Sequence, residues 1–466
     1  MDTGIDKGVR RYRSSRRNVL FVDEHPDLVE LIYSTPATIR KAREIISDID
    51  EDHVVVPMLD AIFERATKAA DEKGAKYANT SLISHHEGTW FSQFEADQLT
   101  RTEDAYLKQT DGDLIHDTFR FLRAAARGAV FLARFVPAAF VAYELKYEPG
   151  PGHVLLDATA DLSGMVALMD GMEELEVPTV DFSNLDIRLI DHPADYRSMR
   201  KVLSREKHAK PYAAWIEQIV LQNTKPGDDI LVVYHKDLGP LGHNYIKGSE
   251  DPDDPWDPNG RKVNTLHWGI GVGSNHWKNK TKVFLFGEFF IPGRASIAQS
   301  LAYGGELPTS DLLSQNSGSV LQGNAAIIHE GHLLRWQKQL ACRGAVRNID
   351  PQGRCGPMTL YTSMNPERLL ENLDRLFPGA KPPVLPVPAN AKPSDKLAAL
   401  LSDTDRSEMT STEIQGLTGL QARKLGEALK SRKLKAIMDA HGWSFVSARG
   451  KGQQAKLVKS ETPIRM

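Results

Sequence analysis

The stretch Asp229-Ile-Leu-Val-Val-Tyr234 is apolar after its first residue and is followed by the polar pair His235-Lys236. Such a run, bounded by polar residues, is typical of a buried strand. Comparable runs at 18–22, 153–156, 263–268, 282–286 and 358–361 are mostly followed by polar or glycine-containing turns and then by amphipathic stretches. This alternation predicts an α/β fold with mostly parallel strands.

The composition is that of a globular protein and excludes a fully disordered or fibrous chain. Hydrophobic residues make up 41% and charged residues 26% of the 466 residues. This length predicts about two to four domains. The 58 Lys and Arg residues nearly balance the 61 Asp and Glu residues, giving a net charge of -3. Contact with nucleic acid would therefore have to come from local basic patches.

The cysteines and the apolar segments indicate a cytoplasmic protein. Cys342 and Cys355 are the two cysteines. They exclude a disulfide framework and are too few for a structural zinc cluster, so we expect two ordinary, partly buried thiols. The sequence has no run of eighteen apolar residues, so it predicts no membrane span. The apolar residues 19–22 end at Asp23-Glu24, which is too short a run for a signal peptide.

Shifts in composition suggest where domains begin and end. Residues 378–393 contain six prolines, a pattern typical of a semi-rigid, extended linker. A small basic segment follows the linker. Residues 37–127 are polar, show helical patterns and carry few strand signals, so we expect a helical insertion of about residues 37–150 between the first two strands.

The segment Asn18-Val-Leu-Phe-Val-Asp23-Glu24-His25-Pro26 is an apolar strand that ends in two carboxylates. The carboxyl end of a strand faces the ligand crevice of an open α/β sheet. There an aspartate can hold Mg²⁺ and a glutamate can polarise an attacking water, as in a Walker B motif. The alternative interpretation is a strand end with a solvated acidic turn.

A second strand, His153-Val-Leu-Leu-Asp157-Ala-Thr159-Ala160, ends in small residues and a hydroxyl group. Its turn could couple the state of a nucleotide to a neighbouring domain. A tight turn between a strand and a helix is the structural alternative.

The third motif, Thr265-Leu-His-Trp-Gly269-Ile-Gly271-Val-Gly273-Ser274-Asn275, places three alternating glycines after a strand. Glycines allow phosphates or a partner strand to approach the backbone closely. The spacing differs from the dinucleotide-binding fingerprint. The segment could equally be a glycine-rich turn without a ligand.

The fourth motif, Gln339-Leu-Ala-Cys-Arg343-Gly-Ala-Val-Arg347, follows a predicted helix over residues 321–340. Arg343 and Arg347 are four residues apart, which predicts that they share one helical face. Two guanidinium groups together suit the charge that develops on a transferred phosphate. An exposed basic helix end is the alternative.

The order of these motifs resembles that of superfamily 2 helicases of the DEAD/DEAH type, over residues 18–380. Asp23-Glu24-His25-Pro26 resembles motif II, residues 157–160 resemble motif III, and residues 229–236 resemble the first strand of the second RecA-like domain. The glycine-rich segment resembles motif V, and the Gln339 segment resembles motif VI. The arginines of motif VI are usually three residues apart, so which one acts as the finger stays open.

This resemblance implies a nucleic-acid-dependent ATPase that uses ATP and Mg²⁺. It assigns catalysis to Asp23, Glu24, His25, Thr159, Gln339, Arg343 and Arg347, with Asp23 on the metal. It assigns sensing of nucleotide and strand to Gly271, Gly273, Ser274 and Asn275. The expected architecture is a partial RecA-like domain in residues 1–185, a second RecA-like domain in 186–380, a linker in 381–393 and a tail domain in 394–466.

One element of the family is missing from the sequence. No segment matches Gly-x-x-x-x-Gly-Lys-[Ser/Thr], the Walker A loop that cradles the β- and γ-phosphates, and only 22 residues precede Asp23. A start site assigned too late, a gene split by a frameshift or a degenerate homologue would each explain this. The functional alternatives are a helicase or translocase of phage, plasmid or other mobile-element replication, a DNA-binding accessory protein without catalysis, and a two-chain enzyme completed by a separately encoded N-terminal half.

The tail, residues 394–466, resembles a winged helix-turn-helix. Thr410-Ser-Thr-Glu413 is a capping box, a second helix is expected near residues 420–431, and residues 442–459 read as a hairpin. Residues 421–466 contain 11 basic and 3 acidic residues, a local charge of +8 that suits binding of single-stranded or forked DNA. A solvated basic face or a protein-docking module is the alternative. The expected DNA contacts are Arg423, Lys424, Lys430, Arg432, Lys433, Arg449, Lys451 and Lys456.

We expect that replacing Lys430, Lys433 and Lys451 by alanine weakens DNA binding and flattens its salt dependence, because each lysine that contacts a phosphate releases a counterion. Fluorescence anisotropy with labelled DNA at several salt concentrations measures both quantities. Unchanged affinity and an unchanged salt slope would contradict the assignment of the tail.

Overall fold

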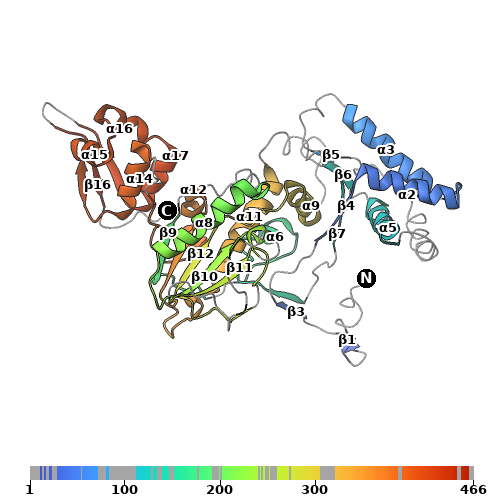
Figure 1. Cartoon of the computed structure of the whole chain (residues 1–466), viewed down its shortest axis with the longest axis horizontal. Coiled ribbons are helices and arrows are strands. Elements are labelled where there is room, and N and C mark those ends of the chain that lie inside the picture. The colour runs from blue at the N-terminus through green and yellow to red at the C-terminus, as the bar shows by residue number, and fades with distance from the viewer. Residues whose placement is uncertain are drawn as a thin grey trace. The chain divides into compact units, whose positions relative to one another are not determined.

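The computed structural model divides into two compact units (Figure 1). Unit 1 is Met1–Glu174 with Ile291–His332, and unit 2 is Leu175–Phe290 with Leu333–Met466. The structure describes residues 11–12, 15–16, 20–23, 29–53, 55–71, 80–82, 112–126, 130–133, 139–145, 152–175, 178–190, 199, 202–239, 242, 245–246, 251, 260–271, 274–304, 321–386, 391–448 and 453–460.

Unit 1 contains an antiparallel sheet in the order β4-β7-β6-β5, formed by Val29–Ser34, Ala139–Leu145, Val130–Ala133 and Thr80–Leu82. Helices α2 (Pro36–Ile49), α3 (Val55–Asp71) and α5 (Gly112–Ala126) share one apolar core with Ile32 of β4. The helices expected in the insertion at about 37–150 are present, but this range also supplies the strands β5, β6 and β7. The runs Val-Phe-Leu-Ala and Ala-Phe-Val-Ala-Tyr-Glu-Leu form β6 and β7 because their apolar residues pair across a sheet.

Two further strand pairs and two helices belong to unit 1. β1 (Arg11–Tyr12) pairs with β2 (Ser15–Arg16), and β3 (Leu20–Asp23) pairs in parallel with β8 (His153–Leu156). Helix α6 is Met165–Leu168 and α9 is Gly293–Gly304. Ile297, Ala298 and Leu301 of α9 are buried in one cluster with Val141 of β7. Residues 291–332, which the sequence placed in the second RecA-like domain, therefore belong to unit 1.

Unit 2 is built on five parallel strands in the order β11-β10-β12-β13-β9. The strands are Lys262–His267, Asp229–Tyr234, Lys282–Leu285, Met358–Thr362 and Leu185–Leu189. The prediction of a mixed α/β fold with parallel strands is confirmed. Strand β9 was not predicted, because it alternates buried and exposed residues instead of forming an apolar run. That alternation suits a strand at the edge of the sheet.

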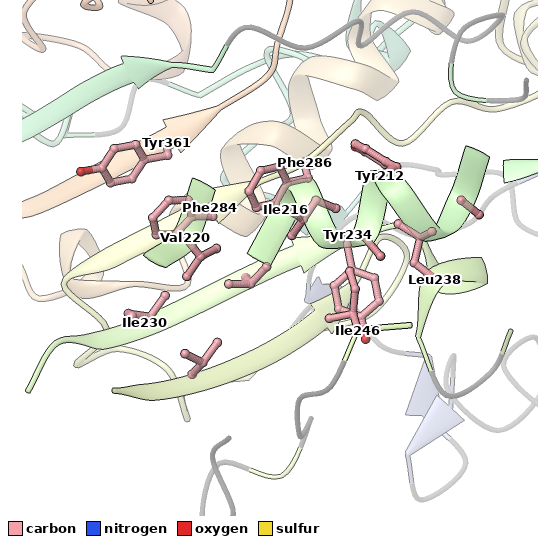
Figure 2. Packing of buried hydrophobic residues seen from close by; sticks show 14 of the residues in the cluster. Tyr212, Ile216, Val220, Ile230, Tyr234, Leu238, Ile246, Phe284, Phe286 and Tyr361 are labelled. Atoms are coloured by element: carbon pink, nitrogen blue, oxygen red, sulfur yellow. The ribbon is translucent and has the colours of Figure 1, made fainter. Parts of the chain in front are cut away.

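Helix α8 (Glu206–Gln222) covers one face of this sheet (Figure 2). Its buried residues Tyr212, Ile216 and Val220 pack in one cluster with Ile230, Phe284 and Tyr361 from three strands. Phe284 is stacked on Tyr361, with 4.3 Å between ring centroids. Since this cluster joins three strands to one helix, its burial stabilises the packing of α8 on the sheet.

The remaining elements around the sheet are short, apart from one long helix. They are η1 (Lys236–Leu238), α11 (Gly323–Ala341), η2 (Ala345–Arg347), α12 (Pro366–Glu371) and α13 (Leu373–Leu376). Helix α11 confirms the helix expected over 321–340. Its first residues belong to unit 1 and its last residues to unit 2.

The sequence predicted a linker at 381–393, and the first part of this segment is attached to the sheet. Val384 forms a parallel bridge with Arg188 of β9, and its backbone N–H donates to the Ile187 carbonyl at 3.0 Å. Leu385 is buried, and its N–H donates to the Ser402 hydroxyl. Helix α14 (Pro393–Asp403) then begins at the last proline of the segment.

After α14, the described residues of the tail form three further helices and a three-stranded antiparallel sheet in the order β14-β16-β15. The helices are α15 (Ser411–Thr418), α16 (Ala422–Ala428) and α17 (Arg432–Ala440), and the strands are Glu408–Thr410, Lys456–Lys459 and Trp443–Val446. The capping box is confirmed, since Thr410 and Glu413 each accept from the other's N–H. The hairpin is confirmed as well.

Helices α14 and α17 of the tail were not predicted. The second helix ends at Ala428 instead of continuing to residue 431, and α17 follows it. The Ser431 hydroxyl accepts from the N–H of Leu434 at 3.3 Å and so caps α17. Burial of Leu434, Ile437 and Met438 along one side then favours a separate helix.

In the part of the chain that the structure describes, no helix combines the length and the apolar character that crossing a bilayer requires.

We expect Phe284→Ala to lower the free energy of unfolding of unit 2 by about 3–5 kcal/mol, because a fully buried ring would leave a cavity among three strands. Urea denaturation followed by circular dichroism measures the change. Ile349→Ala, at a side chain that is 53% exposed, is the control and should change stability by less than about 0.5 kcal/mol. Equal effects would contradict the assigned core.

Candidate functional site

Two arginine side chains of unit 2 converge on one backbone oxygen. Nη1 of Arg343 donates to the Ser274 carbonyl at 3.0 Å, and Nη1 of Arg347 donates to the same oxygen at 3.1 Å. A carbonyl oxygen has two lone pairs and can accept both bonds. Arg343 is buried, with 6% of its surface exposed, whereas Arg347 is exposed. An anion could therefore reach Arg347 directly, beside a second positive charge.

The glycine-rich segment brings Ser274 to this position. Gly269 and Gly271 follow β11 with φ angles of 100° and 84°, a conformation that L side chains rarely adopt. A Cβ on Gly271 would also lie 2.9 Å from Cδ1 of Leu266. Asn275 is exposed, and its carbonyl accepts from the N–H of Lys278. Val272 and Gly273 lie outside the described residues.

The expectation that Arg343 and Arg347 share a helical face is wrong, although the two side chains do meet. Helix α11 ends at Ala341, and Arg347 is the last residue of η2. Gly344 lies between the two arginines in an extended conformation. A Cβ there would lie 2.7 Å from Val283 and still closer to Met358, so the chain passes too near the sheet to continue a helix.

Two glutamines of α11 have different surroundings. Gln339, the expected catalytic residue, is partly buried. Gln337 is buried, and its Nε2 donates to the Thr362 hydroxyl at the end of β13. Sequence reasoning missed Gln337. The available signal was a polar residue on the apolar stripe of a helix, four residues after Leu333 and three before Leu340.

The predicted carboxylate site lies in unit 1, on the parallel pair β3 and β8. Asp23 is the last residue of β3 and is paired with Leu156, so it ends at the same edge as Asp157. Thr159 is buried, and both its N–H and its hydroxyl donate to Oδ1 of Asp157, at 2.8 and 2.7 Å. Glu24 and His25 lie outside the described residues. Thr159 thus holds its own turn together, as the structural alternative expected.

A second polar group, which the sequence did not predict, lies at the carboxyl end of the sheet in unit 2. His235 follows β10, and its Nε2 has no hydrogen-bond partner among the described residues. Burial lowers the pKa of His235 to about 4, so the imidazole is neutral at pH 7. Gly287, with φ 77°, follows β12 and leaves room for this ring, because a Cβ there would lie 3.1 Å from it.

A buried ion pair lies beside this histidine. Oε1 of Glu288 is 2.7 Å from Nη1 of Arg368 in α12, and the Glu288 side chain is 4% exposed. The N–H of Gly287 donates to the Ser363 hydroxyl at 2.7 Å. The neutral His235 imidazole, the Glu288 carboxylate and the Ser363 hydroxyl therefore follow the carboxyl ends of β10, β12 and β13. Open α/β sheets usually bind ligands at this edge.

The predicted DNA contacts of the tail fall into three groups. Arg423, Lys424 and Lys430 are exposed on or next to α16, as expected. Arg432, Lys433 and Lys456 form ion pairs with Glu371, Asp395 and Glu408 respectively. Arg449 and Lys451 lie outside the described residues.

A metal centre requires three or more histidine, cysteine or acidic side chains close together. The described residues contain no such group. Cys342 and Cys355 are free thiols. Burial raises the pKa of Cys342 to about 11, which keeps it protonated and unreactive at pH 7.

Comparison with known proteins gives two structural similarities. No model of a known protein family matches the sequence, and no curated protein matches it. A solved XPD helicase is similar with a TM-score of 0.38 and 16% identity, over 78% of this chain and 67% of that one. Xpd4 of S. tokodaii is similar with a TM-score of 0.38 and 12% identity, over 74% of this chain and 70% of that one. Similarity of this size does not assign a function.

We expect the free energy of unfolding to fall by about 2 kcal/mol between pH 7 and pH 5 because of His235. Its pKa rises from about 4 in the folded protein to about 6.5 in the unfolded chain. Below pH 6.5 the unfolded state therefore binds a proton that the folded state excludes. Urea denaturation at both pH values measures the loss.

The variant His235→Gln should lose this part of the pH dependence, since glutamine does not titrate. His276→Gln, at an exposed histidine of the same unit, is the matched control. An unchanged difference between pH 7 and pH 5 in His235→Gln would show that His235 is not the group responsible.

Proposed function

We propose that this chain is part of an ATP-dependent nucleic-acid helicase or translocase. The observation that carries this proposal is the convergence of Arg343 and Arg347 on the Ser274 carbonyl, next to a glycine turn in a parallel α/β unit. Phosphoryl transfer is catalysed mainly by placing positive charge on the oxygens of the transferred phosphate. An exposed guanidinium that a backbone contact holds in place is suited to that task.

The exposures of the two arginines suggest different roles. Arg347 is exposed and would act as the finger that contacts the phosphate. Arg343 is buried and would act as a positioning residue, because it fixes the Ser274 carbonyl to which Arg347 also binds. Gln339 lies one turn before Arg343 in sequence and would support the same site.

In the intact motor, Asp23 and Glu24 would complete the chemistry. Asp23 ends a parallel strand, and a carboxylate there suits Mg²⁺, which prefers oxygen ligands. Bound Mg²⁺ would neutralise charge on the phosphates of ATP. Glu24 would polarise the attacking water, with His25 beside it, and the Thr159 turn would couple nucleotide state to movement. Gly271, Gly273, Ser274 and Asn275 would sense nucleotide and strand.

We also propose that the tail is a winged helix that binds single-stranded or forked DNA. Helices α15, α16 and α17 are followed by the hairpin β15–β16, an order that suits this assignment. The exposed Arg423, Lys424 and Lys430 offer phosphate contacts. A role in the replication of a phage, plasmid or other mobile element stays a prediction.

A second candidate function is that of a DNA-binding accessory protein without ATPase activity. It is favoured by the basic tail and by the lack of a Walker A sequence in these 466 residues. A separately encoded N-terminal half that supplies the phosphate loop would instead restore the motor function. Adding such a half to the assay would separate these two cases.

Steady-state ATP hydrolysis, with and without single-stranded DNA, tests the motor function. We expect DNA-stimulated turnover in the wild type and about a 10³-fold lower kcat in Arg347→Ala, because the transferred phosphate loses its cationic partner. Glu24→Gln should abolish turnover as well. Arg205→Ala, at an exposed arginine of the same unit, is the control and should keep wild-type kcat.

Two outcomes would contradict this proposal. If Arg347→Ala retained full turnover, the finger assignment would be wrong. If the wild type bound DNA but hydrolysed no ATP, the chain by itself would be the accessory protein.

A further inference from the structure

The first turn of α17 is held by carboxylates from two other helices. The Arg432 guanidinium pairs with Glu371, and its Nε lies 3.8 Å from Oε2 of Glu367, both in α12. Nζ of Lys433 lies 2.8 Å from Oδ1 of Asp395 in α14. The hydrogen bond from Lys433 is the main cause that lowers the pKa of Asp395 below its usual value. Both cations at the start of α17 are therefore already neutralised.

Helix α12 is fixed in a position that presents its acidic residues to α17. The Asn365 side chain accepts from the N–H of Arg368 at 3.0 Å and caps the helix, and Pro366 occupies its first turn. Arg368 then joins α12 to the buried Glu288 of the sheet. Glu367 and Glu371 are four residues apart, which places them on one face of the helix.

Arg406 and Lys456 of the tail also pair with carboxylates, Glu413 and Glu408, but four other tail cations differ. No ion pair links Arg423, Lys424, Lys430 or Lys435 to a carboxylate among the described residues, and all four are exposed. At the N-terminal end of α17, both Arg432 and Lys433 have carboxylate partners.

In a helix-turn-helix the N-terminal residues of the recognition helix contact base edges. We assign that role to α17, because it directly precedes the β15–β16 hairpin. Arg432 and Lys433 at its start are paired with carboxylates of the protein, whereas Arg423, Lys424 and Lys430 on or next to α16 are exposed.

We propose that α12 is an intramolecular competitor that masks the DNA-binding end of α17. This inference rests on the proposed DNA-binding function of the tail. Exposed ion pairs contribute little free energy, so a polyanion can displace them. DNA binding then requires Glu367 and Glu371 to give up Arg432, which lowers the affinity and the number of counterions released. Any ligand or partner that moves α12 would raise the affinity of the tail for DNA.

The test compares the full-length wild type with the double variant Glu367→Gln/Glu371→Gln. The probe is a fluorescein-labelled forked DNA, and anisotropy is measured at several salt concentrations. We expect about 2- to 10-fold tighter binding and a salt slope that is steeper by about one, because Arg432 becomes free to contact a phosphate. The control is Glu173→Gln/Glu174→Gln, which changes the net charge equally at two exposed acids of unit 1.

A third change links the effect to Arg432. Arg432→Ala should alter wild-type binding little, because that cation is occupied, but it should remove the gain in the Glu367→Gln/Glu371→Gln background. Affinity no higher than in the control variant, or a gain that survives Arg432→Ala, would overturn the masking role while DNA binding stands. If no variant bound DNA at low salt, the tail function and the masking role would both be wrong.

Discussion

The buried carboxylate of Glu288 sets the arrangement of unit 2 beyond its sheet. A charged group at the end of a buried strand is costly unless a cation and hydrogen bonds satisfy it. Arg368 supplies that cation at 2.7 Å, and this contact fixes α12 against the sheet. Helix α12 in turn contacts α17 through Arg432, so the ion pair at Glu288 supports one of the contacts between the sheet and the tail. The apolar core beneath α8 stabilises the sheet, whereas the Glu288–Arg368 ion pair orients α12 against it.

The same sheet organises the arginine site in another way. The described residues between β11 and β12 form no helix, and the chain turns at Gly269 and Gly271. Later in the chain, Gly344 lies close to Val283 of β12. This approach brings Arg343 and Arg347 to the segment that contains Ser274. The arginine side chains therefore reach a backbone carbonyl about 70 residues away in sequence, because glycines at two places let the backbone pass close to its neighbours.

The strands with continuous apolar runs could be predicted from sequence, because residues buried on both faces leave a local signal. Strand β9 and the strands β6 and β7 left weaker signals, since their alternation or short length resembles other patterns. The meeting of Arg343 with Arg347 was expected, but for the wrong reason, because the end of α11 depends on the tertiary contact at Gly344. His235 and the pair Glu288–Arg368 left no signal, because their significance comes from partners far along the chain.

The bridge between Val384 and Arg188 has a consequence for solubility. Strand β9 lies at one end of the sheet, and an uncovered edge strand is a template for pairing with other chains. The proline-rich segment covers part of that edge, and its prolines lack the N–H groups that would extend the ladder to a further strand. The segment that leads to the tail therefore also protects the sheet from edge-to-edge aggregation, so the natural cut between sheet and tail lies after Val384 and not at residue 381.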